Sequence, residues 1–466
     1  MGDEVSVNVS NVITIDNPSR ELLSWCTQSL RIRNPDYDKK VRMHFWLGKT
    51  PEWLYLYEVH GDKLVLPFGT LRNIIPMIDV NDIKMDFQVS EKIEYDCEIP
   101  LYDYQEKAVE EVYWKHYGIL QSAAGSGKTQ MAIQLIAKLG KRALFLTHTK
   151  DLLTQAKQRA EQYMDPALLG TITEGKVNIG KGITFATVQT MCNLDLAQYK
   201  DLWDVIIVDE CHRVAGTPTA VSQFSKVLNS LAARHKYGLS ATVHRSDGLI
   251  QSTFALLGEV IYTVPTEAVA DKIMKVGIHP VPTGVGISRE CLNTDGTLNY
   301  AKLISYLAES DDRNIHIIKC IVANRENPSL ILSDRLGHLE TLMSMLPADM
   351  REDAVMVSGK MTTKKGKAER EQAIADMRSG AKKYLFATYS LCKEGLDIPR
   401  LERLYMTTPQ KDYAVITQSI GRIARTSAGK AVPICYDFVD DIQYLVKAYK
   451  KRCTTYRKNG CYFVER

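Results

Sequence analysis

Short apolar runs alternate with amphipathic stretches from about residue 100 to the end of the chain. The first series of runs is YGILQSA, ALFLTHT, ITFATVQT, VIIVDE and YGLSAT. Continuous apolar runs of this length are typical of strands that are buried on both faces of a parallel sheet. A second series follows, with SLILSD, AVMVSG, YLFATY, RLYMTT and AVPICYDF. Because strands that alternate with helices indicate βαβ units, the pattern predicts two α/β domains in tandem.

The two series meet in a segment rich in glycine and proline, residues 276–287, as is typical of a connection. We therefore expect the first α/β domain at residues 96–278 and the second at residues 279–466. Residues 1–95 differ, because three of the five tryptophans lie there. Two aromatic, β-prone runs around residues 48–51 predict a hairpin. We expect a small α+β accessory domain that engages the substrate, whose aromatic residues form its core or stack on bases.

The composition is ordinary for a globular protein, with 45% hydrophobic residues, 24% charged residues and a net charge of +4. A net charge this small does not require a polyanionic partner, so any basic surface has to be local. No apolar run approaches the length of a membrane helix, and the N-terminus lacks the pattern of a signal peptide. The ten cysteines show no zinc-binding spacing, which favours free thiols in a reducing compartment.

The first candidate for chemistry is the glycine-rich stretch SAAGSGKTQMAIQ, which follows an apolar run and opens an amphipathic pattern. In this strand–loop–helix order, backbone N–H groups and a helix N-terminus bind a triphosphate. Lys128 is expected to reach the β- and γ-phosphates, and the Thr129 hydroxyl to bind Mg²⁺. The general pattern has glycine where this chain has Ser122, and a chance glycine-rich turn is the alternative. The other loop residues expected at the nucleotide are Ala124, Gly125, Ser126 and Gly127.

Two acidic residues, Asp209 and Glu210, end the apolar run VIIV. Ligands of open α/β sheets bind at the carboxyl ends of the strands. Asp209 is therefore expected to hold the Mg²⁺ of the nucleotide, and Glu210 to orient and deprotonate the attacking water. An ordinary acidic strand end is the alternative, which the upstream glycine-rich loop disfavours. The predicted cofactors are ATP and Mg²⁺.

Arg422 and Arg425 lie three residues apart in QSIGRIART. Residues with this spacing share one face of a helix, and we expect both on the helix that follows a strand near residues 404–407. An arginine that stabilises the charge of the phosphoryl-transfer transition state accelerates the reaction roughly 10³–10⁵-fold. We predict this role for both arginines. The alternative is that they pair with surface carboxylates or face solvent.

In order and spacing, these motifs resemble those of superfamily 2 helicases over residues 100–440. LYDYQ resembles the Q motif, AAGSGKT motif I, THTKDLLTQ motif Ia, ATVQT motif Ic, DECH motif II, SAT motif III, ATYSLCKEGLDIP motif V and QSIGRIAR motif VI. GLSATVHRSDGL and QSIGRIAR are most similar to the group that contains XPB and phage UvsW. Two positions depart from that group, because Tyr102 stands where arginine is usual and Val243 where many have proline.

The resemblance implies RecA-like folds for both α/β domains and roles for further residues. Ser240 and Thr242 would couple hydrolysis to domain closure, and Gln418 would act with the two arginines. Further residues expected at the nucleotide are Gln105, which reads adenine, Gly395 and Asp397. Residues expected to contact the nucleic-acid backbone are Thr147, Thr149, Thr187, Gln189 and Thr388. Contacts to the backbone position a strand without reading its sequence, which suits a motor.

The sequence therefore predicts an ATP-dependent DNA helicase or translocase that unwinds or remodels branched or forked DNA. Single-stranded, forked or branched DNA is the expected partner, with RNA as a weaker alternative and no membrane partner. We expect a monomer or weak oligomer in the cytoplasm of a bacterium or of a phage-infected host. A duplex DNA translocase without strand separation is the enzymatic rival. The rival of another class is a nucleic-acid-binding protein with an inactive ATPase site, which the complete set of charged motif residues disfavours.

Overall fold

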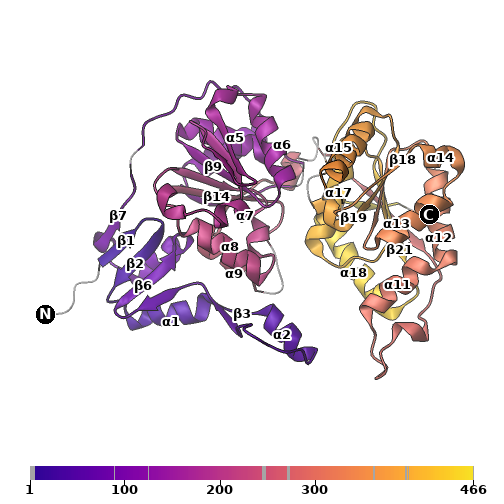
Figure 1. Cartoon of the computed structure of the whole chain (residues 1–466), viewed down its shortest axis with the longest axis horizontal. Coiled ribbons are helices and arrows are strands. Elements are labelled where there is room, and N and C mark those ends of the chain that lie inside the picture. Colours follow the sequence, from indigo (N-terminus) through magenta and orange to yellow (C-terminus); the bar gives the residue numbers. More distant parts are fainter. Residues whose placement is uncertain are drawn as a thin grey trace. The chain divides into compact units, whose positions relative to one another are not determined.

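The computed structural model describes residues 6–88, 90–123, 125–243, 248–269, 273–359, 361, 363–393, 396 and 398–464 of the 466-residue chain. The chain divides into two compact units, Met1–Ala123 with Gly127–Pro265 and Thr266–Arg466 with Ala124–Ser126, and Figure 1 shows the elements of each unit. Within the described residues, no helix combines the length and the apolarity that crossing a bilayer requires.

A small N-terminal sheet opens the first unit. Its strand order is β5-β6-β2-β1-β7, in which β1 and β7 are parallel and the other neighbours are antiparallel. The strands are β1 (Ser6–Val9), β2 (Val12–Asp16), β5 (Glu58–His60), β6 (Lys63–Pro67) and β7 (Ile83–Met85). Alternate residues of β1 and β2 are buried in a core that helix α1 (Arg20–Ser29) also enters. This α+β domain agrees with the sequence prediction.

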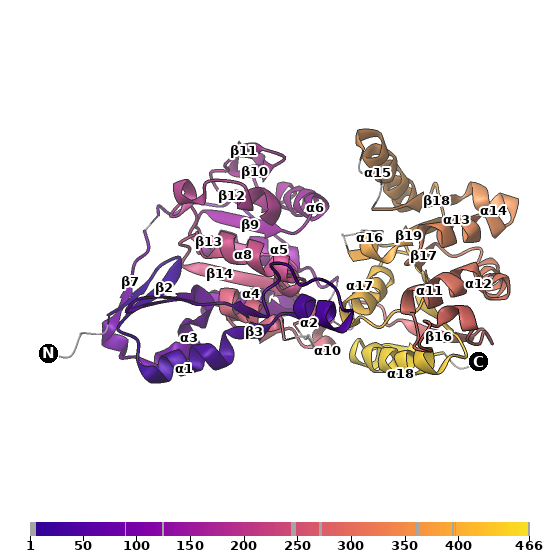
Figure 2. The same cartoon turned by 60° about the horizontal axis from the view of Figure 1, so that its bottom comes forward.

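The segment after α1 differs from the predicted hairpin. Residues before the expected turn form helix α2 (Pro35–Arg42), and β4 (Trp53–Tyr55) pairs antiparallel with β3 (Arg31–Arg33); Figure 2 shows this extension. The prediction was wrong because it gave weight to the aromatic residues and none to the helix signals. The Asn34 side chain caps the helix, and Pro35 occupies its first turn, as is common at helix N-termini.

A larger, mostly parallel sheet forms the centre of the first unit. Its strand order is β11-β10-β12-β9-β13-β14-β8-β15, and among the described residues only β10 and β11 pair antiparallel. The strands are β8 (Tyr117–Gln121), β9 (Ala143–Thr147), β10 (Leu169–Thr173), β11 (Lys176–Asn178), β12 (Ile183–Thr187), β13 (Val205–Val208), β14 (His235–Ser240) and β15 (Val260–Thr263). The helices are α4 (Asp103–Tyr113), α5 (Lys128–Leu139), α6 (Lys150–Glu161), α7 (Val188–Cys192), α8 (Pro218–Leu228) and α9 (Ile250–Leu257). Every residue of β9, β12 and β13 is buried, as the continuous apolar runs predicted.

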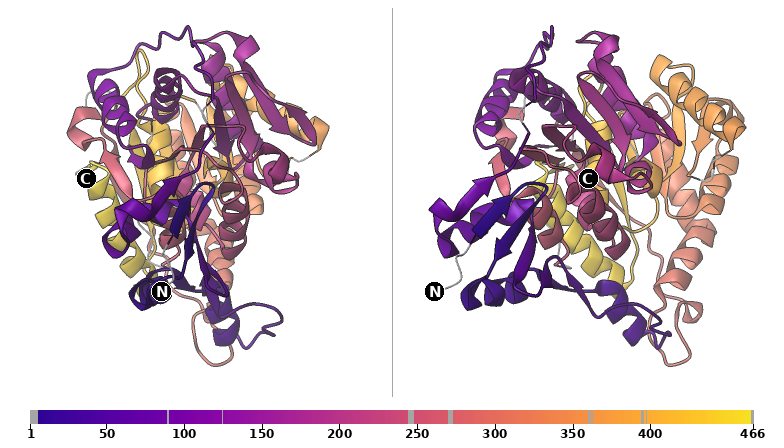
Figure 3. Two further views of the ribbon diagram at one scale, coloured as in Figure 1. Left: turned by 90° about the vertical axis from the view of Figure 1, so that its left-hand side faces the viewer. Right: turned by 60° about the vertical axis from the view of Figure 1, so that its left-hand side comes forward.

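The N-terminal sheet and the larger sheet share one hydrophobic core. Tyr117 and Leu249 of the larger domain pack into the same cluster as the residues of β1 and β2. The approach is closest at Gly69, where a Cβ atom would lie 2.4 Å from the backbone nitrogen of Gly258 and 2.6 Å from the carbonyl oxygen of Ala255. A side chain at residue 69 would clash with backbone atoms that cannot move aside. The N-terminal domain is therefore fixed to the first α/β domain. Figure 3 shows the ribbon from two further sides.

The second unit contains a parallel sheet with the strand order β18-β19-β17-β20-β21-β16-β22. The strands are β16 (Gly277–Pro282), β17 (Ser329–Ser333), β18 (Ala354–Val357), β19 (Tyr384–Thr388), β20 (Arg403–Met406), β21 (Ile434–Val439) and β22 (Tyr462–Phe463). Helices of this unit include α11 (Tyr300–Glu309), α12 (Asp311–Ala323), α13 (Leu336–Met345), α15 (Lys364–Ser379), α17 (Tyr413–Ile423) and α18 (Gln443–Lys458). The unit begins before the expected boundary at residue 279, because β16 belongs to its sheet.

Candidate nucleotide and nucleic-acid sites

The glycine-rich loop joins the end of β8 to the start of α5, which begins at Lys128. Gly125 and Gly127 have φ values of 84° and 80°, in the left-handed region that glycine adopts without steric cost. A Cβ atom on Gly127 would also lie 2.3 Å from Nε2 of Gln105. The buried Gln105 of α4 is therefore held directly against the loop. Ala124 lies outside the described residues.

The side chain of Lys128 is buried inside this loop. Its Nζ atom donates hydrogen bonds to the carbonyl oxygens of Ser122 and Ala123, both at 3.3 Å. The ammonium is thus held at the loop whose backbone binds the β- and γ-phosphates in phosphate-loop proteins. Thr129 follows in the first turn of α5 and is partly exposed.

Asp209 and Glu210 follow β13, at the carboxyl end of the sheet. Burial and, next in size, the charge of Glu210 raise the pKa of Asp209 to about 7, whereas the charge of Lys128 opposes this shift. A buried carboxylate of this kind is stabilised by a cation. Glu210 adopts φ 48° and ψ 49°, a left-handed conformation that costs a residue with a side chain about 1–3 kcal/mol and that clusters at functional sites.

A chain of polar contacts connects motif II to motif III. Nδ1 of His212 lies 3.3 Å from Oε2 of Glu210 and 3.1 Å from Oγ of Ser240. The Ser240 hydroxyl donates to the carbonyl oxygen of Thr242 at 2.5 Å and accepts from the Thr242 N–H at 3.0 Å. Because the Ser240 proton is used on that carbonyl, Nδ1 of His212 acts as the donor. His212 is a functional candidate that the sequence analysis missed; its place in the DECH motif was the available signal.

Two of the expected nucleic-acid residues meet at the ends of neighbouring strands, because Thr147 of β9 pairs in register with Thr187 of β12. Both are buried. The Thr147 hydroxyl donates to the carbonyl oxygen of Thr149 at 3.0 Å, and Thr187 caps α7 by accepting from the Thr190 N–H at 3.3 Å. Thr149 and Gln189 are partly exposed. The structure thus brings these residues together at one edge of the sheet, where the two buried hydroxyls hold the loops.

The candidates of the second unit lie on α17, after it, and at the end of β19. The Thr388 hydroxyl at the end of β19 is 2.9 Å from Oγ of Ser390. Gln418 is buried on α17. Nη1 of Arg422 donates to the carbonyl oxygen of Leu396 at 2.9 Å, which joins motif VI to motif V. Gly395 and Asp397, on either side of Leu396, lie outside the described residues.

Arg425 is not on the helix that carries Arg422, contrary to our expectation. Helix α17 ends at Ile423, and Arg425 forms an isolated antiparallel bridge with Ile273. The backbone leaves the helix here because the N–H of Met274 donates to the carbonyl oxygen of Ala424 at 2.7 Å. The prediction that Arg422 and Arg425 share one face of a helix was therefore wrong.

A second residue that the sequence analysis missed, Lys430, holds this segment. Its Nζ atom donates to the carbonyl oxygens of Pro399, Ile423 and Arg425 at 2.8, 2.8 and 2.6 Å. Burial lowers the pKa of Lys430 to about 8, with Glu402 opposing the shift and Arg425 adding to it. A single lysine in the loop TSAGKAVP carries no pattern from which this contact could be predicted.

Two parallel-sheet domains, a glycine-rich loop before a helix and acidic residues at the end of another strand of the same sheet define the class of phosphate-loop ATPases. Two family models match successive parts of the chain, "Type III restriction enzyme, res subunit" over residues 98–245 and "Helicase conserved C-terminal domain" over residues 312–427. The chain belongs to the superfamily 2 helicases. This membership implies an ATPase that acts on nucleic acid.

Relatives with helicase or translocase names match most of the chain. A putative ATP-dependent RNA helicase of Acanthamoeba polyphaga mimivirus is 26% identical over 73% of this chain, which spans 64% of that relative, less than two thirds of its length. A DNA 3'-5' translocase of Sulfurisphaera tokodaii is 24% identical over 72% of this chain and 81% of its own. In fold, the chain is similar to the ATP-dependent type ISP restriction-modification enzyme LlaBIII, with a TM-score of 0.56, 17% identity and coverage of 80% of this chain and 30% of that one.

Proposed function

We propose that the protein hydrolyses ATP to move along DNA and to unwind or remodel forked or branched DNA. The observation that carries the ATPase part is the arrangement around the glycine-rich loop, where Lys128 is buried and Asp209 and Glu210 follow β13, which is separated from β8 by β14 alone. DNA is favoured by the motif resemblance to the group of XPB and UvsW and by the name of the Sulfurisphaera tokodaii relative.

In this proposal, Lys128 binds the β- and γ-phosphates, and Thr129 and Asp209 hold Mg²⁺. The donor set fits the ion, because Mg²⁺ prefers hydroxyl and carboxylate oxygens and the Asp209 carboxylate is buried. When bound, Mg²⁺ neutralises the charge that develops on the phosphates. Glu210 orients the attacking water and accepts its proton. Gln105 contacts the adenine, next to the loop residues Gly125, Ser126 and Gly127.

The second α/β domain supplies the remaining groups. We assign Arg422 and Arg425 to the charge of the transition state, with Gln418 on the helix of Arg422 and Gly395 and Asp397 at the nucleotide. The hydrogen bond from Arg422 to the Leu396 carbonyl supports this grouping, because Leu396 is the residue between Gly395 and Asp397 in motif V.

Coupling to movement is assigned to the contacts between motifs II and III. Glu210 contacts His212, and His212 contacts Ser240, which is bonded to Thr242. A change at the water-activating carboxylate can reach Thr242 through these contacts. Residues assigned to the nucleic-acid backbone are Thr147, Thr149, Thr187, Gln189 and Thr388. Residues 1–95 form the substrate-engaging accessory domain in this proposal.

The test is ATP hydrolysis without nucleic acid and with single-stranded DNA, blunt duplex DNA, a fork, a four-way junction or RNA, all at one salt concentration. Salt has to be fixed because phosphate contacts make affinity strongly salt-dependent. Stronger stimulation by forks and junctions than by blunt duplex supports remodelling. Stimulation by blunt duplex alone favours a duplex translocase, and stimulation by RNA alone favours the RNA helicase that the mimivirus relative's name suggests. No stimulation by any of them contradicts the proposal.

A further inference from the structure

Residues 31–55, which we call the arm, extend from the N-terminal sheet. Strands β3 and β4 form its base, with Arg31 paired to Tyr55 and Arg33 to Trp53. Helix α2 and the residues that follow it form the far part of the arm, and α2 contributes no buried residue to any core. Figure 2 shows α2 beyond the strands of the N-terminal domain.

The base of the arm is firmly held. The guanidinium groups of Arg31 and Arg33 lie 4.5 and 5.1 Å from the centre of the Trp53 ring, within cation–π range. Asn34 is buried, and its side chain donates to the carbonyl oxygen of Pro51 at 2.7 Å. These contacts close the arm across its base, so the residues beyond Asn34 and before Pro51 are presented in one arrangement.

The tip of the arm is apolar and open to solvent. Trp46 is 87% exposed and Phe45 58% exposed, although these are side chains that usually dominate cores and interfaces. Val41 and Met43, which precede Phe45 by four and two residues, are also about half exposed. Single exposed apolar residues are normal, whereas a cluster of this kind marks a contact site.

The charge of the tip identifies the kind of partner. Residues 39–50 contain Lys39, Lys40, Arg42 and Lys49 and no aspartate or glutamate. Lys39 and Lys49 are exposed. Cations interleaved with exposed aromatic rings are the combination that binds single-stranded nucleic acid, in which the cations follow the phosphates and the rings stack on bases.

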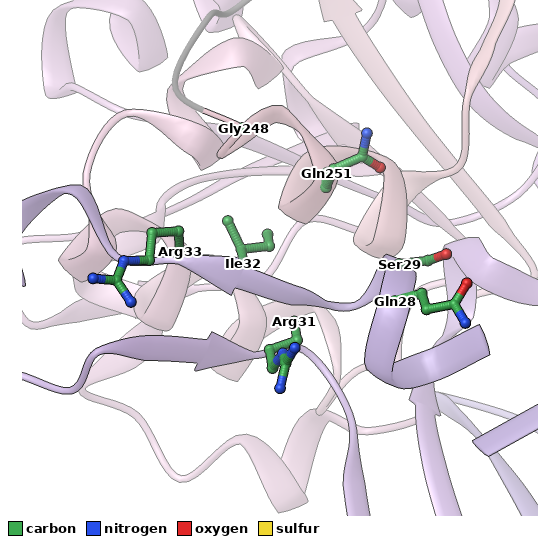
Figure 4. A pocket seen from close by; sticks show the side chains of 7 residues that line it. All are labelled: Gln28, Ser29, Arg31, Ile32, Arg33, Gly248 and Gln251. Atoms are coloured by element: carbon green, nitrogen blue, oxygen red, sulfur yellow. The ribbon is translucent and has the colours of Figure 1, made fainter. Parts of the chain in front are cut away.

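The arm also borders a pocket at the junction with the first α/β domain. The pocket has a volume of about 410 Å³ and is lined by Gln28, Ser29, Arg31, Ile32, Arg33, Gly248 and Gln251. Figure 4 shows Ile32 pointing toward Gln251 of α9 and Arg31 pointing away from it. Polar and basic groups therefore continue from the tip to the base of the arm. Since the N-terminal domain shares a core with the ATP-binding domain, the arm is a fixed part of that domain.

We propose that the arm tip binds unpaired nucleic-acid strand, with Trp46 and Phe45 stacking on bases and the surrounding cations on phosphates. This inference rests on the proposed function and names the part of the accessory domain that engages the substrate. Unpaired strand is the class of ligand, because stacking needs base faces that a blunt duplex exposes only at its ends.

The test compares Trp46→Ala with Trp114→Ala in the full chain. Trp114 is a matched control, since it is 67% exposed and lies in the same unit but outside the arm. Binding of a single-stranded oligonucleotide and of a fork is measured by fluorescence anisotropy, together with ATPase activity without nucleic acid. We expect Trp46→Ala to weaken binding about 5- to 150-fold, the range for loss of one stacked base. Trp114→Ala is expected to bind as the wild type does, and the basal ATPase activity to stay unchanged in both.

A second variant, Lys39→Glu with Lys49→Glu, tests the phosphate contacts. We expect this variant to show a shallower slope of log affinity against log salt concentration. With fewer phosphate contacts, binding releases fewer counterions from the nucleic acid. Wild-type affinity in Trp46→Ala would overturn the inference and leave the proposed function standing. A wild-type protein that neither binds nucleic acid nor responds to it would overturn both. If Trp46→Ala lost binding to anionic phospholipid vesicles but kept its nucleic-acid binding, the tip would be assigned to a membrane surface. That result would also overturn the inference.

Discussion

The ammonium of Lys236 donates a hydrogen bond to the carbonyl oxygen of Asn11 at 3.2 Å. Lys236 is on β14 of the ATP-binding domain, and Asn11 is in the turn between β1 and β2 of the N-terminal domain. The same ammonium donates to the carbonyl oxygen of Leu228 at 2.9 Å and lies 4.9 Å from the centre of the Phe68 ring. A fully buried lysine therefore ties the two domains together, four residues before Ser240 of motif III.

This contact predicts an unusual dependence of stability on pH. Burial lowers the pKa of Lys236 to about 7, whereas in the unfolded chain a lysine titrates near 10.4. Between these values the unfolded state binds more protons, so the free energy of unfolding rises with pH. We expect wild type to gain stability over Lys236→Met between pH 7 and pH 9, by up to about 1.4 kcal/mol per pH unit.

Urea unfolding at pH 7, 8 and 9 measures this difference. Lys84→Met, at an exposed lysine of the N-terminal strand β7, is the control for the loss of a lysine from the same unit. A constant difference between wild type and Lys236→Met would contradict a lowered pKa.

The burial of Lys236 is a feature that could not be predicted from the sequence. The apolar runs predicted the two parallel sheets because strands buried on both faces leave a signal within five or six residues. The burial of Lys236 depends on Asn11 and Phe68, which are more than 160 residues away in the chain, so no local pattern carries it. Lys430 is a similar case, since its three carbonyl partners come from two separate segments.

The candidate site was more predictable than these contacts. Lys128 begins the helix that the strand–loop–helix pattern predicted, and Asp209 and Glu210 follow a buried strand of the same sheet, as their apolar run predicted. Helix α2 could also have been predicted, because Asn34 and Pro35 are ordinary helix-start signals. The position of Arg425 outside α17 could not have been predicted, since the end of that helix depends on the distant segment around Met274.

Glu210→Gln is expected to abolish most ATP hydrolysis while ATP still binds. The amide keeps the size of the side chain but cannot accept the proton of the attacking water, and a general base contributes about 10²–10⁴-fold in rate. The measurement is single-turnover hydrolysis together with nucleotide binding by equilibrium dialysis. An unchanged hydrolysis rate would refute the role assigned to Glu210.

His212→Ala is expected to separate hydrolysis from strand separation. The substitution removes the donor that joins Glu210 to Ser240 and leaves both of those residues in place. Unwinding of a labelled fork should fall by a larger factor than DNA-stimulated ATP hydrolysis measured in the same reaction. His212→Gln is a matched variant, because its amide N–H can still donate to Ser240. Equal losses of unwinding and hydrolysis in both variants would argue against a coupling role.

Lys430 predicts a fall of activity at alkaline pH. Three carbonyl oxygens accept from its ammonium, and a neutral amine has only two N–H groups to donate. As the pH rises through the pKa of about 8, the segment that carries Arg425 should loosen, and DNA-stimulated kcat should fall between pH 7 and pH 9. Stability should respond in the opposite direction, because the unfolded lysine keeps its proton to a higher pH.

The variants Lys430→Met and Lys430→Arg distinguish this effect from other titrations. Methionine donates to none of the three carbonyl oxygens, so kcat is expected to be low at both pH values and to lose the alkaline fall. Arginine keeps its charge throughout this range and has five N–H donors, so Lys430→Arg is expected to retain activity at pH 9. If all three proteins gave the same pH profile, the alkaline fall would belong to another group and Lys430 would have no part in positioning Arg425.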